Sequence, residues 1–385
     1  MTFSSDDAFS QQPFSLRQFS LQELGWRAEF AQSLTLDDLE AGFPARVAAV
    51  HRDRYVLLAE CGELEAVLPG RWREDAEAIL PTVGDWVLVE QEQPRLLRVL
   101  PRHSLIERMA AGEAAMTQAI AANIDTLFIT TSCNADFNPA RLERYLAMAR
   151  TAGVAPVIVL TKADLAADVA AYEAEVHKLG ADLPCVALNA TEPAALDALR
   201  PWLEAGQTVA FSGSSGVGKS TLVNTLAGRE LQATGAIRED DAKGRHTTTG
   251  RELVACVHAG DVAWLIDTPG MRELRLGEAD AGLEDTFADV LTLAQDCHFR
   301  DCLHEAEPGC AVQAAIVAGE LEERRLLSWR KLARESAHAR EALWQRHARE
   351  QKTGRLYKRI QNDKRAQKGN VDLAHRSRDR SDDKG

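Results

Sequence analysis

The spacing of hydrophobic and polar positions changes along the 385-residue chain. Between about residues 44 and 101, short runs with partial alternation, such as RYVLLAE and DWVLVEQ, are separated by turn-forming Gly, Asp and Pro. This spacing is typical of a small β-barrel, and an OB-fold is the first choice. From about residue 121, the apolar runs TLFITT and APVIVLTK alternate with helical stretches such as PARLERYLAMARTAG. That alternation predicts a parallel α/β sheet.

The change of pattern along the chain predicts a multidomain protein. The chain is also long enough for more than one hydrophobic core. We expect an N-terminal arm at residues 1–40, the barrel at 41–110 and the α/β domain at 111–286. A mostly helical domain is expected at 287–350. Residues 351–385 are expected to form a basic tail of low hydrophobicity that is disordered toward its end.

Net charge and the number and spacing of the cysteines indicate which partners and which cellular compartment to expect. The formal net charge of −13 argues against a nucleic-acid partner, but residues 351–385 carry eleven Lys/Arg against five Asp, a local excess of +6. Seven cysteines, three of them close together, favour a reducing compartment with one local metal site over a disulfide framework. Because the chain has no long apolar run and no signal pattern, we expect a cytoplasmic protein with no membrane partner.

The strongest chemical signal is the segment GSSGVGKS at residues 213–220, which follows the apolar strand TVAFS and precedes the helical run TLVNTLAG. In this context a glycine-rich loop turns its N–H groups around phosphates, the lysine neutralises β- and γ-phosphate charge, and the serine ligates Mg²⁺. The alternative interpretation is a Gly/Ser linker. The predicted phosphate-binding residues are Gly213, Ser214, Ser215, Gly216, Val217, Gly218, Lys219, Ser220 and Thr221, with Ser220 as a magnesium ligand.

Guanine specificity is predicted for the motif TKAD, which directly follows a strand ending in VIVL. Asp164 can accept hydrogen bonds from both N1–H and the exocyclic amine of guanine, whereas adenine would leave a buried carboxylate unpaired. Thr161 replaces the Asn of the usual Asn-Lys-x-Asp motif, so we expect a weaker bridging role at this position. An ordinary strand-to-helix cap is the alternative, and the segment LNAT at 188–191 is a weaker candidate for backing the base. The predicted guanine-binding residues are Thr161, Lys162, Ala163 and Asp164.

The order of these motifs is inverted relative to most GTPases, because Asp164 precedes Gly213. We therefore expect the usual C-terminal half of the sheet to be joined ahead of its N-terminal half. The segment after DTPG, residues 267–270, then becomes the exit of the domain. A nucleotide-dependent movement of this segment can be transmitted directly to the region that follows it in the chain.

Two further segments are predicted to sense the γ-phosphate. In AWLIDTPG, Asp267 ends a buried strand and can hold Mg²⁺ through water, and the N–H of Gly270 can meet the γ-phosphate. The polar loop REDDAKGRHTTTG, residues 238–250, is expected to order only when γ-phosphate and Mg²⁺ are present. Among its three consecutive threonines, we favour Thr248 as the magnesium ligand.

The residue that orients the attacking water is harder to assign. Met271 follows DTPG where many GTPases carry a Gln, and a thioether cannot orient a water molecule usefully. His246, in the Thr-rich loop, is the candidate catalytic residue, because an imidazole can be neutral near pH 7. The alternative is an exposed loop histidine without a role.

Four soft ligands lie within fourteen residues near the C-terminus, in the order Cys297-x4-Cys302-x-His304-x5-Cys310. Three thiolates and one imidazole predict a tetrahedral structural zinc site with no open position. The metal should therefore fold the segment rather than catalyse a reaction. Reduced structural cysteines are the alternative.

Together, these motifs resemble the circularly permuted ribosome-biogenesis GTPases of the RsgA (YjeQ) type. The resemblance rests on LQELGW, TKADL, GSSGVGKSTLVN, KGRHTTT, DTPGMREL and CHFRDCLHEAEPGCAV, which span nearly the whole chain in order. It implies an N-terminal OB-fold, a permuted GTPase domain and a C-terminal zinc domain. It also implies late maturation of the small (30S) ribosomal subunit, rRNA binding and subunit-stimulated GTP hydrolysis, with His246 matching the catalytic histidine. The departures from the family pattern are Thr161 and the acidic overall charge.

The residues favour an RNA partner independently of the resemblance. A small barrel and a zinc segment are modules often used on RNA, and residues 324–368 carry many Lys/Arg with apolar interruptions. A solvated charged helix is the alternative interpretation of this stretch. Rival functions are an RNA-binding scaffold that uses GTP mainly for stability or regulation, and an ATPase or nucleotide kinase. The expected ligands are GTP or GDP, Mg²⁺ and one structural Zn²⁺, and the protein is expected to be a monomer.

Overall fold

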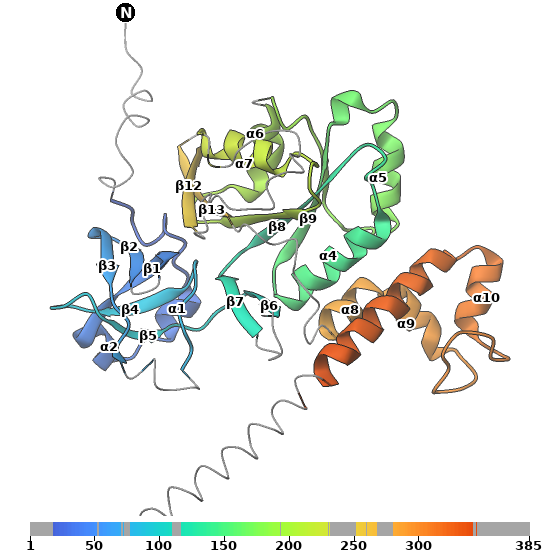
Figure 1. Cartoon of the computed structure of the whole chain (residues 1–385), viewed down its shortest axis with the longest axis horizontal. Coiled ribbons are helices and arrows are strands. Elements are labelled where there is room, and N and C mark those ends of the chain that lie inside the picture. Colours follow the sequence, from blue (N-terminus) through green and yellow to red (C-terminus); the bar gives the residue numbers. More distant parts are fainter. Residues whose placement is uncertain are drawn as a thin grey trace, which may run out of the picture.

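The computed structural model describes residues 18–51, 54–70, 72, 78–109, 117–192, 194–229, 231, 252–258, 260–267, 280–341 and 344. In this part of the chain a small barrel, a central α/β sheet and a helical C-terminal region follow one another (Figure 1). The multidomain architecture predicted from the sequence is thereby confirmed.

The barrel consists of β1 (Gly42–Val50), β2 (Tyr55–Ala59), β3 (Gly62–Ala66), β4 (Trp86–Glu90) and β5 (Leu96–Val99). β1 pairs with β2 and β4, β2 pairs with β3, and β4 pairs with β5. A parallel bridge between Val67 and Arg95 brings the end of β3 back toward β5 and closes the ring. Val47, Leu57 and Val89 are fully buried inside it. These short, half-buried strands form the OB-type barrel that the sequence predicts.

The central sheet consists of β8 (Thr126–Ser132), β9 (Ala155–Thr161), β10 (Cys185–Ala187), β11 (Thr208–Gly213), β12 (Glu252–His258) and β13 (Asp261–Asp267). Its spatial order is β10-β9-β8-β11-β13-β12. β12 runs antiparallel to β13, and the other neighbours are parallel. β11 therefore lies between β8 and β13, although β8 and β9 precede it in the chain. This is the arrangement predicted for a permuted domain.

Helices cover both faces of the sheet. They are α4 (Pro139–Thr151) and α5 (Val169–His177) on one face, and α6 (Ala194–Leu199) and α7 (Lys219–Ala227) on the other (Figure 1). Successive residues of β8 face opposite layers, because Ile129 shares a core cluster with Leu146 of α4, whereas Phe128 shares one with Leu222 of α7. The described part of this domain also contains two short 3₁₀ turns, η2 (Ala163–Leu165) and η3 (Arg200–Trp202).

The N-terminal segment at residues 18–41 packs into the joint between the barrel and the sheet. Phe19 meets Trp264 of β13 edge-on, with ring centroids 5.2 Å apart. Gly25 has a φ of 87°, and a Cβ atom there would lie 2.5 Å from the carbonyl oxygen of Gly206. This close approach requires glycine and explains the Gly of LQELGW. The segment contains two short helices, α1 (Ala28–Gln32) and α2 (Leu36–Ala41).

A separate two-stranded hairpin links the barrel to the sheet. Its strands are β6 (Leu105–Met109) and β7 (Thr117–Ala122). The hydroxyl of Ser104, just before β6, donates to the carbonyl oxygen of Ile124 at 2.7 Å. The hairpin spans the position of the predicted domain boundary at residue 110.

The C-terminal region contains α8 (Asp280–Thr286), α9 (Ala288–Gln295), α10 (Ala311–Ala318) and helical residues 323–341. These helices share a hydrophobic core of their own, which includes Phe287, Val290 and Val312. Ala147 of α4 belongs to the same cluster, so the region packs directly on the central domain.

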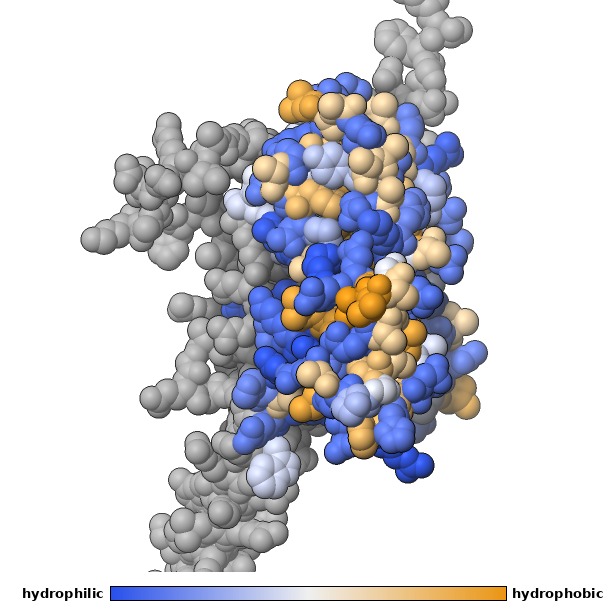
Figure 2. Space-filling model, turned by 90° about the vertical axis from the view of Figure 1, so that its right-hand side faces the viewer, coloured by the Kyte–Doolittle hydropathy of each residue, from blue (hydrophilic) through white to orange (hydrophobic). Residues whose placement is uncertain are grey.

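The surface on this side of the molecule is mainly hydrophilic. Figure 2 shows the face that carries α5 and α10, where small apolar patches lie among polar residues. Val317 of α10, which is 88% exposed, is among the exposed apolar residues. No helix in the described ranges combines the length and the apolar character needed to cross a bilayer.

Candidate nucleotide site and cysteine-histidine cluster

The glycine-rich loop connects β11 to α7, whose first residue is Lys219. A Cβ atom at Gly213 would lie 2.1 Å from the carbonyl oxygen of Thr130 on β8, so only glycine lets the chain leave the sheet here. The Lys219 ammonium group donates to the carbonyl of Gly213 at 2.8 Å and to that of Ser214. The ammonium group and the N-terminus of α7 thus face the same loop, which favours an anionic phosphate chain.

The remaining loop residues differ in exposure. Ser215 and Gly216 are exposed at the rim, whereas Val217 is buried beneath them. Ser220 and Thr221 occupy the first turn of α7, directly after the lysine. The structure therefore brings the predicted phosphate-binding residues together at one end of the central sheet.

The TKAD motif contacts this loop directly. Thr161 ends β9 and is fully buried, and its hydroxyl donates to the carbonyl oxygen of Val217 at 2.5 Å. Lys162 has a φ of 58°, and its ammonium group donates to the carbonyl oxygen of Gly216 at 2.9 Å. Two consecutive side chains therefore tie the motif to the glycine-rich loop. The threonine hydroxyl bridges the two loops even though it replaces the usual amide.

Asp164 lies in η2, where its side chain is exposed beside the LNAT segment. The N–H of Ala163 donates to the carbonyl oxygen of Leu188 at 3.4 Å. The Thr225 hydroxyl of α7 donates to the carbonyl oxygen of Ala190 at 3.1 Å. Three segments that are distant in the sequence therefore meet at the carboxyl ends of β9, β10 and β11. This edge of an open α/β sheet is the usual place for a nucleotide.

One basic residue at this edge was missed by the sequence analysis. Arg141, in the first turn of α4, donates from its guanidinium group to the hydroxyl of Ser214. The sequence does indicate the start of α4, since Asn138 followed by Pro139 is typical of a helix start just after a strand. No motif marks Arg141 itself, so its position beside the loop became visible only in the structure.

The predicted switch residues lie at the limit of the described chain. Asp267 is the last residue of β13, and its backbone pairs with Glu252 of β12. This places the end of β13 next to β11, from which the glycine-rich loop departs. His246, Thr248 and Gly270 lie outside the described residues.

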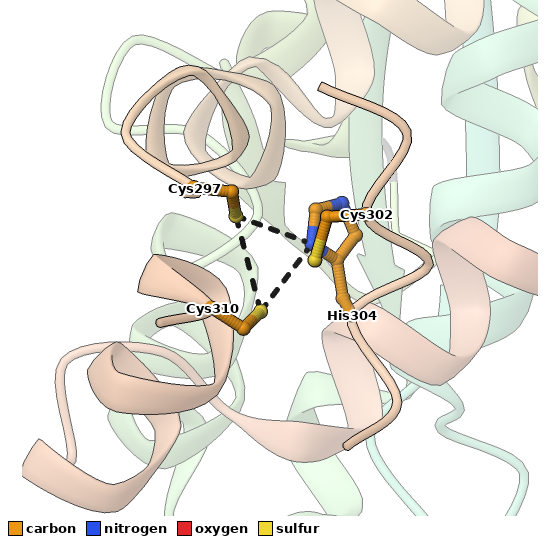
Figure 3. A group of neighbouring side chains, drawn as sticks. All are labelled: Cys297, Cys302, His304 and Cys310. Atoms are coloured by element: carbon orange, nitrogen blue, oxygen red, sulfur yellow. Dashed lines mark hydrogen bonds between the residues drawn. The ribbon is translucent and has the colours of Figure 1, made fainter. Parts of the chain in front are cut away.

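Cys297, Cys302, His304 and Cys310 converge in the C-terminal region (Figure 3). Their ligand atoms all lie within 4.8 Å of one another. The Nδ1 atom of His304 is 3.5 Å from the Sγ atoms of Cys297 and Cys310, which are 3.9 Å apart. Around a tetrahedral Zn²⁺ with standard bond lengths, neighbouring ligand atoms are about 3.6 Å apart for N and S and about 3.8 Å for two S atoms. The four residues therefore fit a zinc ion.

The surroundings of the cluster act differently on its four residues: they favour the metal-binding forms of Cys297 and His304 and the protonated form of Cys302. Burial raises the pKa of Cys297, but hydrogen bonds from the N–H groups of Val312 and Ala311 at the start of α10 lower it below the usual thiol value. Burial also lowers the pKa of His304, which keeps the imidazole neutral at pH 7. Burial and the neighbouring thiols raise the pKa of Cys302 to about 11, so metal binding by this thiol releases a proton.

The fold and the loop geometry define the class of protein as a P-loop GTPase with permuted motif order. The RsgA GTPase family model matches residues 99–277. The chain is 48% identical to "Small ribosomal subunit biogenesis GTPase RsgA 2" of Vibrio vulnificus, covering 92% of this chain and 97% of the relative. It is 52% identical to "Small ribosomal subunit biogenesis GTPase RsgA" of Mesorhizobium japonicum, covering 83% and 90%, respectively. The chain therefore belongs to the RsgA family of GTPases.

Solved structures confirm the fold. YjeQ from Thermotoga maritima superimposes with a TM-score of 0.55 and 22% sequence identity, covering 75% of this chain and 96% of that one. YloQ, described as a circularly permuted GTPase, gives a TM-score of 0.53 and 22% identity, covering 76% and 94%. The family membership and the circular permutation predicted from the motifs are confirmed.

Proposed function

We propose that this GTPase assists late maturation of the small ribosomal subunit, binds its rRNA and hydrolyses GTP faster when the subunit is bound. The observation that carries the proposal is the match over 92% of this chain and 97% of a relative named for small ribosomal subunit biogenesis. The match extends beyond the nucleotide-binding domain, so it includes the barrel and the cysteine-histidine segment, two kinds of module that proteins use on RNA. We further propose that it acts as a monomer in the cytoplasm, where ribosomal subunits are available.

Within the nucleotide site, we assign the phosphates to the glycine-rich loop and the base to Asp164. Mg²⁺ would be held by Ser220 and Thr248 and, through water, by Asp267, and the N–H of Gly270 would meet the γ-phosphate. Replacing Asp164 by Asn should weaken GTP binding much more than xanthosine triphosphate binding, because xanthine offers an oxygen where guanine has its amine. Titration of the Asp164→Asn variant with both nucleotides tests this assignment. Equal losses for the two would remove the carboxylate from base recognition.

We assign a structural Zn²⁺ to Cys297, Cys302, His304 and Cys310. The ion would supply folding free energy to the C-terminal region, because its ligands converge only in the folded state. Cys302→Ser should lose bound zinc and protease resistance in this region, and nucleotide binding should remain largely intact. Cys61→Ser is the matched control, because Cys61 is an exposed cysteine of the barrel. A Cys302→Ser variant that retains one zinc ion with unchanged protease resistance would contradict the ligand set.

The decisive experiment measures GTP turnover with and without purified small ribosomal subunits. Wild-type turnover should rise when subunits are added, and His246→Ala should lose about ten- to a thousand-fold of the stimulated rate while still binding GTP. His177→Ala is the control, because this histidine lies exposed on α5. If the subunits bind without changing wild-type turnover, the alternative of an RNA-binding scaffold is favoured. If His246→Ala reaches the stimulated wild-type rate, another group orients the water.

A further inference from the structure

We propose that Arg141 is a further residue of the nucleotide site, which positions the glycine-rich loop and favours GTP over GDP. This inference rests on the assignment of the loop at residues 213–220 as the phosphate site. It concerns a side chain outside the sequence motifs that identify this GTPase, on a different helix from the loop lysine.

The sheet topology places Arg141 at the loop. β8 is the direct neighbour of β11, with Thr130 paired to Gly213. After β8 the chain turns and starts α4 at Asn138, whose side chain caps the helix by accepting from the N–H of Arg141 at 3.1 Å. Because the carboxyl ends of parallel strands share one edge, the first turn of α4 and the glycine-rich loop lie side by side. The guanidinium group then donates to the Ser214 hydroxyl.

Two other arginines of this part of the molecule are paired with carboxylates, whereas Arg141, like Arg150 of the same helix, donates to a neutral hydroxyl. Arg144, one turn further along α4, pairs with Glu335 at 2.6 Å. Arg324 pairs with Glu143 at 3.0 Å. Among the described residues, by contrast, the Arg141 side chain has a single polar partner, the neutral hydroxyl of Ser214. Four of the five guanidinium N–H donors therefore have no acceptor within the described part of the chain.

Two positive charges converge on the start of the loop. The Lys219 ammonium group donates to the carbonyl oxygens of Gly213 and Ser214, and the Arg141 guanidinium group approaches Ser214 through its side chain. An arginine remains protonated at all physiological pH values. Its charge attracts a triphosphate more than a diphosphate, because the γ-phosphate adds negative charge at this site. Arg141 thus acts through loop geometry and electrostatic attraction, and we classify it as a positioning residue.

The test separates the charge of Arg141 from its hydrogen bond. Dissociation constants for GDP and a non-hydrolysable GTP analogue are measured by calorimetry for Arg141→Ala, Arg141→Gln, Arg141→Lys and Ser214→Ala. The Ala and Gln variants should lose about ten-fold in affinity for the GTP analogue and about two- to three-fold for GDP. Arg141→Lys should recover most of the difference. Ser214→Ala, which alters the phosphate-binding loop but keeps both positive charges, should weaken the binding of both nucleotides to a similar extent, so that the ratio of the two affinities changes by less than about two-fold.

Arg144→Ala is the matched control, because it removes the same charge from the same helix at a carboxylate-paired position. It should leave the ratio of GTP-analogue to GDP affinity unchanged. Equal losses for both nucleotides in Arg141→Ala, or the same shift in Arg144→Ala, would overturn the inference and leave Arg141 a structural residue. If the wild-type protein binds neither nucleotide, the phosphate-site assignment fails instead, so the two failures are distinguishable.

Discussion

The barrel is joined to the central sheet by the pairing of β1 with β12 and by a buried arginine with neutral acceptors, whereas the C-terminal helices are joined to it through paired opposite charges. In the first joint, Arg46 of β1 is 1% exposed. Its guanidinium group donates to the carbonyl oxygen of Leu24 and the hydroxyl of Thr208, both at 2.6 Å, and to the carbonyl oxygen of Asn123 at 3.4 Å. One side chain thus connects the N-terminal segment, the barrel and β11.

In the second joint, the Glu143 side chain of α4 is fully buried. Its Oε1 atom accepts from Arg324 at 3.0 Å and from Arg325 at 3.1 Å. Arg325 also pairs with Asp289 of α9 and donates to the carbonyl oxygen of Thr286 at 2.8 Å. Burial lowers the pKa of Arg325, but the hydrogen bonds and charges of the two acidic partners raise it above the usual value. This joint therefore depends on a balance of charges.

The two joints hold the barrel and the C-terminal helices to the central sheet in different ways. Main-chain carbonyls keep their hydrogen-bonding capacity at every pH and cannot be removed by side-chain substitution, so Arg46 is the side chain whose loss would break these hydrogen bonds of the barrel joint. The C-terminal joint follows β13 and α8, the predicted exit of the nucleotide domain, and loses stability whenever one charge of its network is removed. We therefore expect substitutions in the barrel joint to affect the whole fold and those in the C-terminal joint to affect mainly the helices beyond α8.

The largest effect is expected for Arg46→Ala, which would remove the buried side-chain hydrogen bonds of the first joint. The substitution leaves several buried acceptors without a donor and a cavity in the core, so the free energy of unfolding should fall by about 3–5 kcal/mol. Chemical denaturation followed by tryptophan fluorescence measures this loss. Arg54→Ala, at an exposed pair with Glu65, is the control and should cost less than about 1 kcal/mol. A loss for Arg46→Ala as small as that of the control would contradict the proposed importance of this joint.

A smaller and more local effect is expected for Glu143→Gln, which keeps the shape of the side chain and removes its charge. Two arginines lose a buried carboxylate, although Asp289 still pairs with Arg325, so we expect a loss of about 2–4 kcal/mol. Hydrogen exchange should show faster opening of residues 323–341 than of the barrel. Glu335→Gln, at the partly exposed pair with Arg144, should cost less than about 1 kcal/mol. Uniformly faster exchange throughout the chain would contradict a local joint.

The smallest effect is expected for Asp125→Asn, which tests one of the carboxylates near the first joint. Burial raises the pKa of Asp125, but His103, the N–H of Thr208 and the charge of Arg27 lower it below its ordinary value. A lowered pKa in the folded state adds stability above the pKa of the unfolded state, about 3.9, and this stability is lost as the pH falls through the folded value. The variant should therefore be about 1–2 kcal/mol less stable at pH 7. Denaturation at several pH values should show the gap closing toward pH 3, and a gap that stays constant would exclude this role.

The local motifs of the nucleotide and cysteine-histidine sites were predictable from the sequence. Each of the glycine-rich loop, TKAD and the cysteine spacing can be recognised within a short stretch of sequence. A strand, a tight turn and a helix N-terminus each require particular residue types at neighbouring positions. The barrel and the parallel sheet were also predictable, since their hydrophobic periodicities differ. Their convergence at one edge followed from the rule that parallel strands present their carboxyl ends together.

Only the tertiary structure decided which distant side chains meet. Arg46 contacts a residue 162 positions away, and Glu143 contacts residues 181 and 182 positions away. LQELGW therefore looked like part of an appended arm, and Arg141 was not singled out. Nothing in local spacing identifies such partners, because their energies depend on burial and on which backbone or charged groups the completed fold brings within hydrogen-bonding distance.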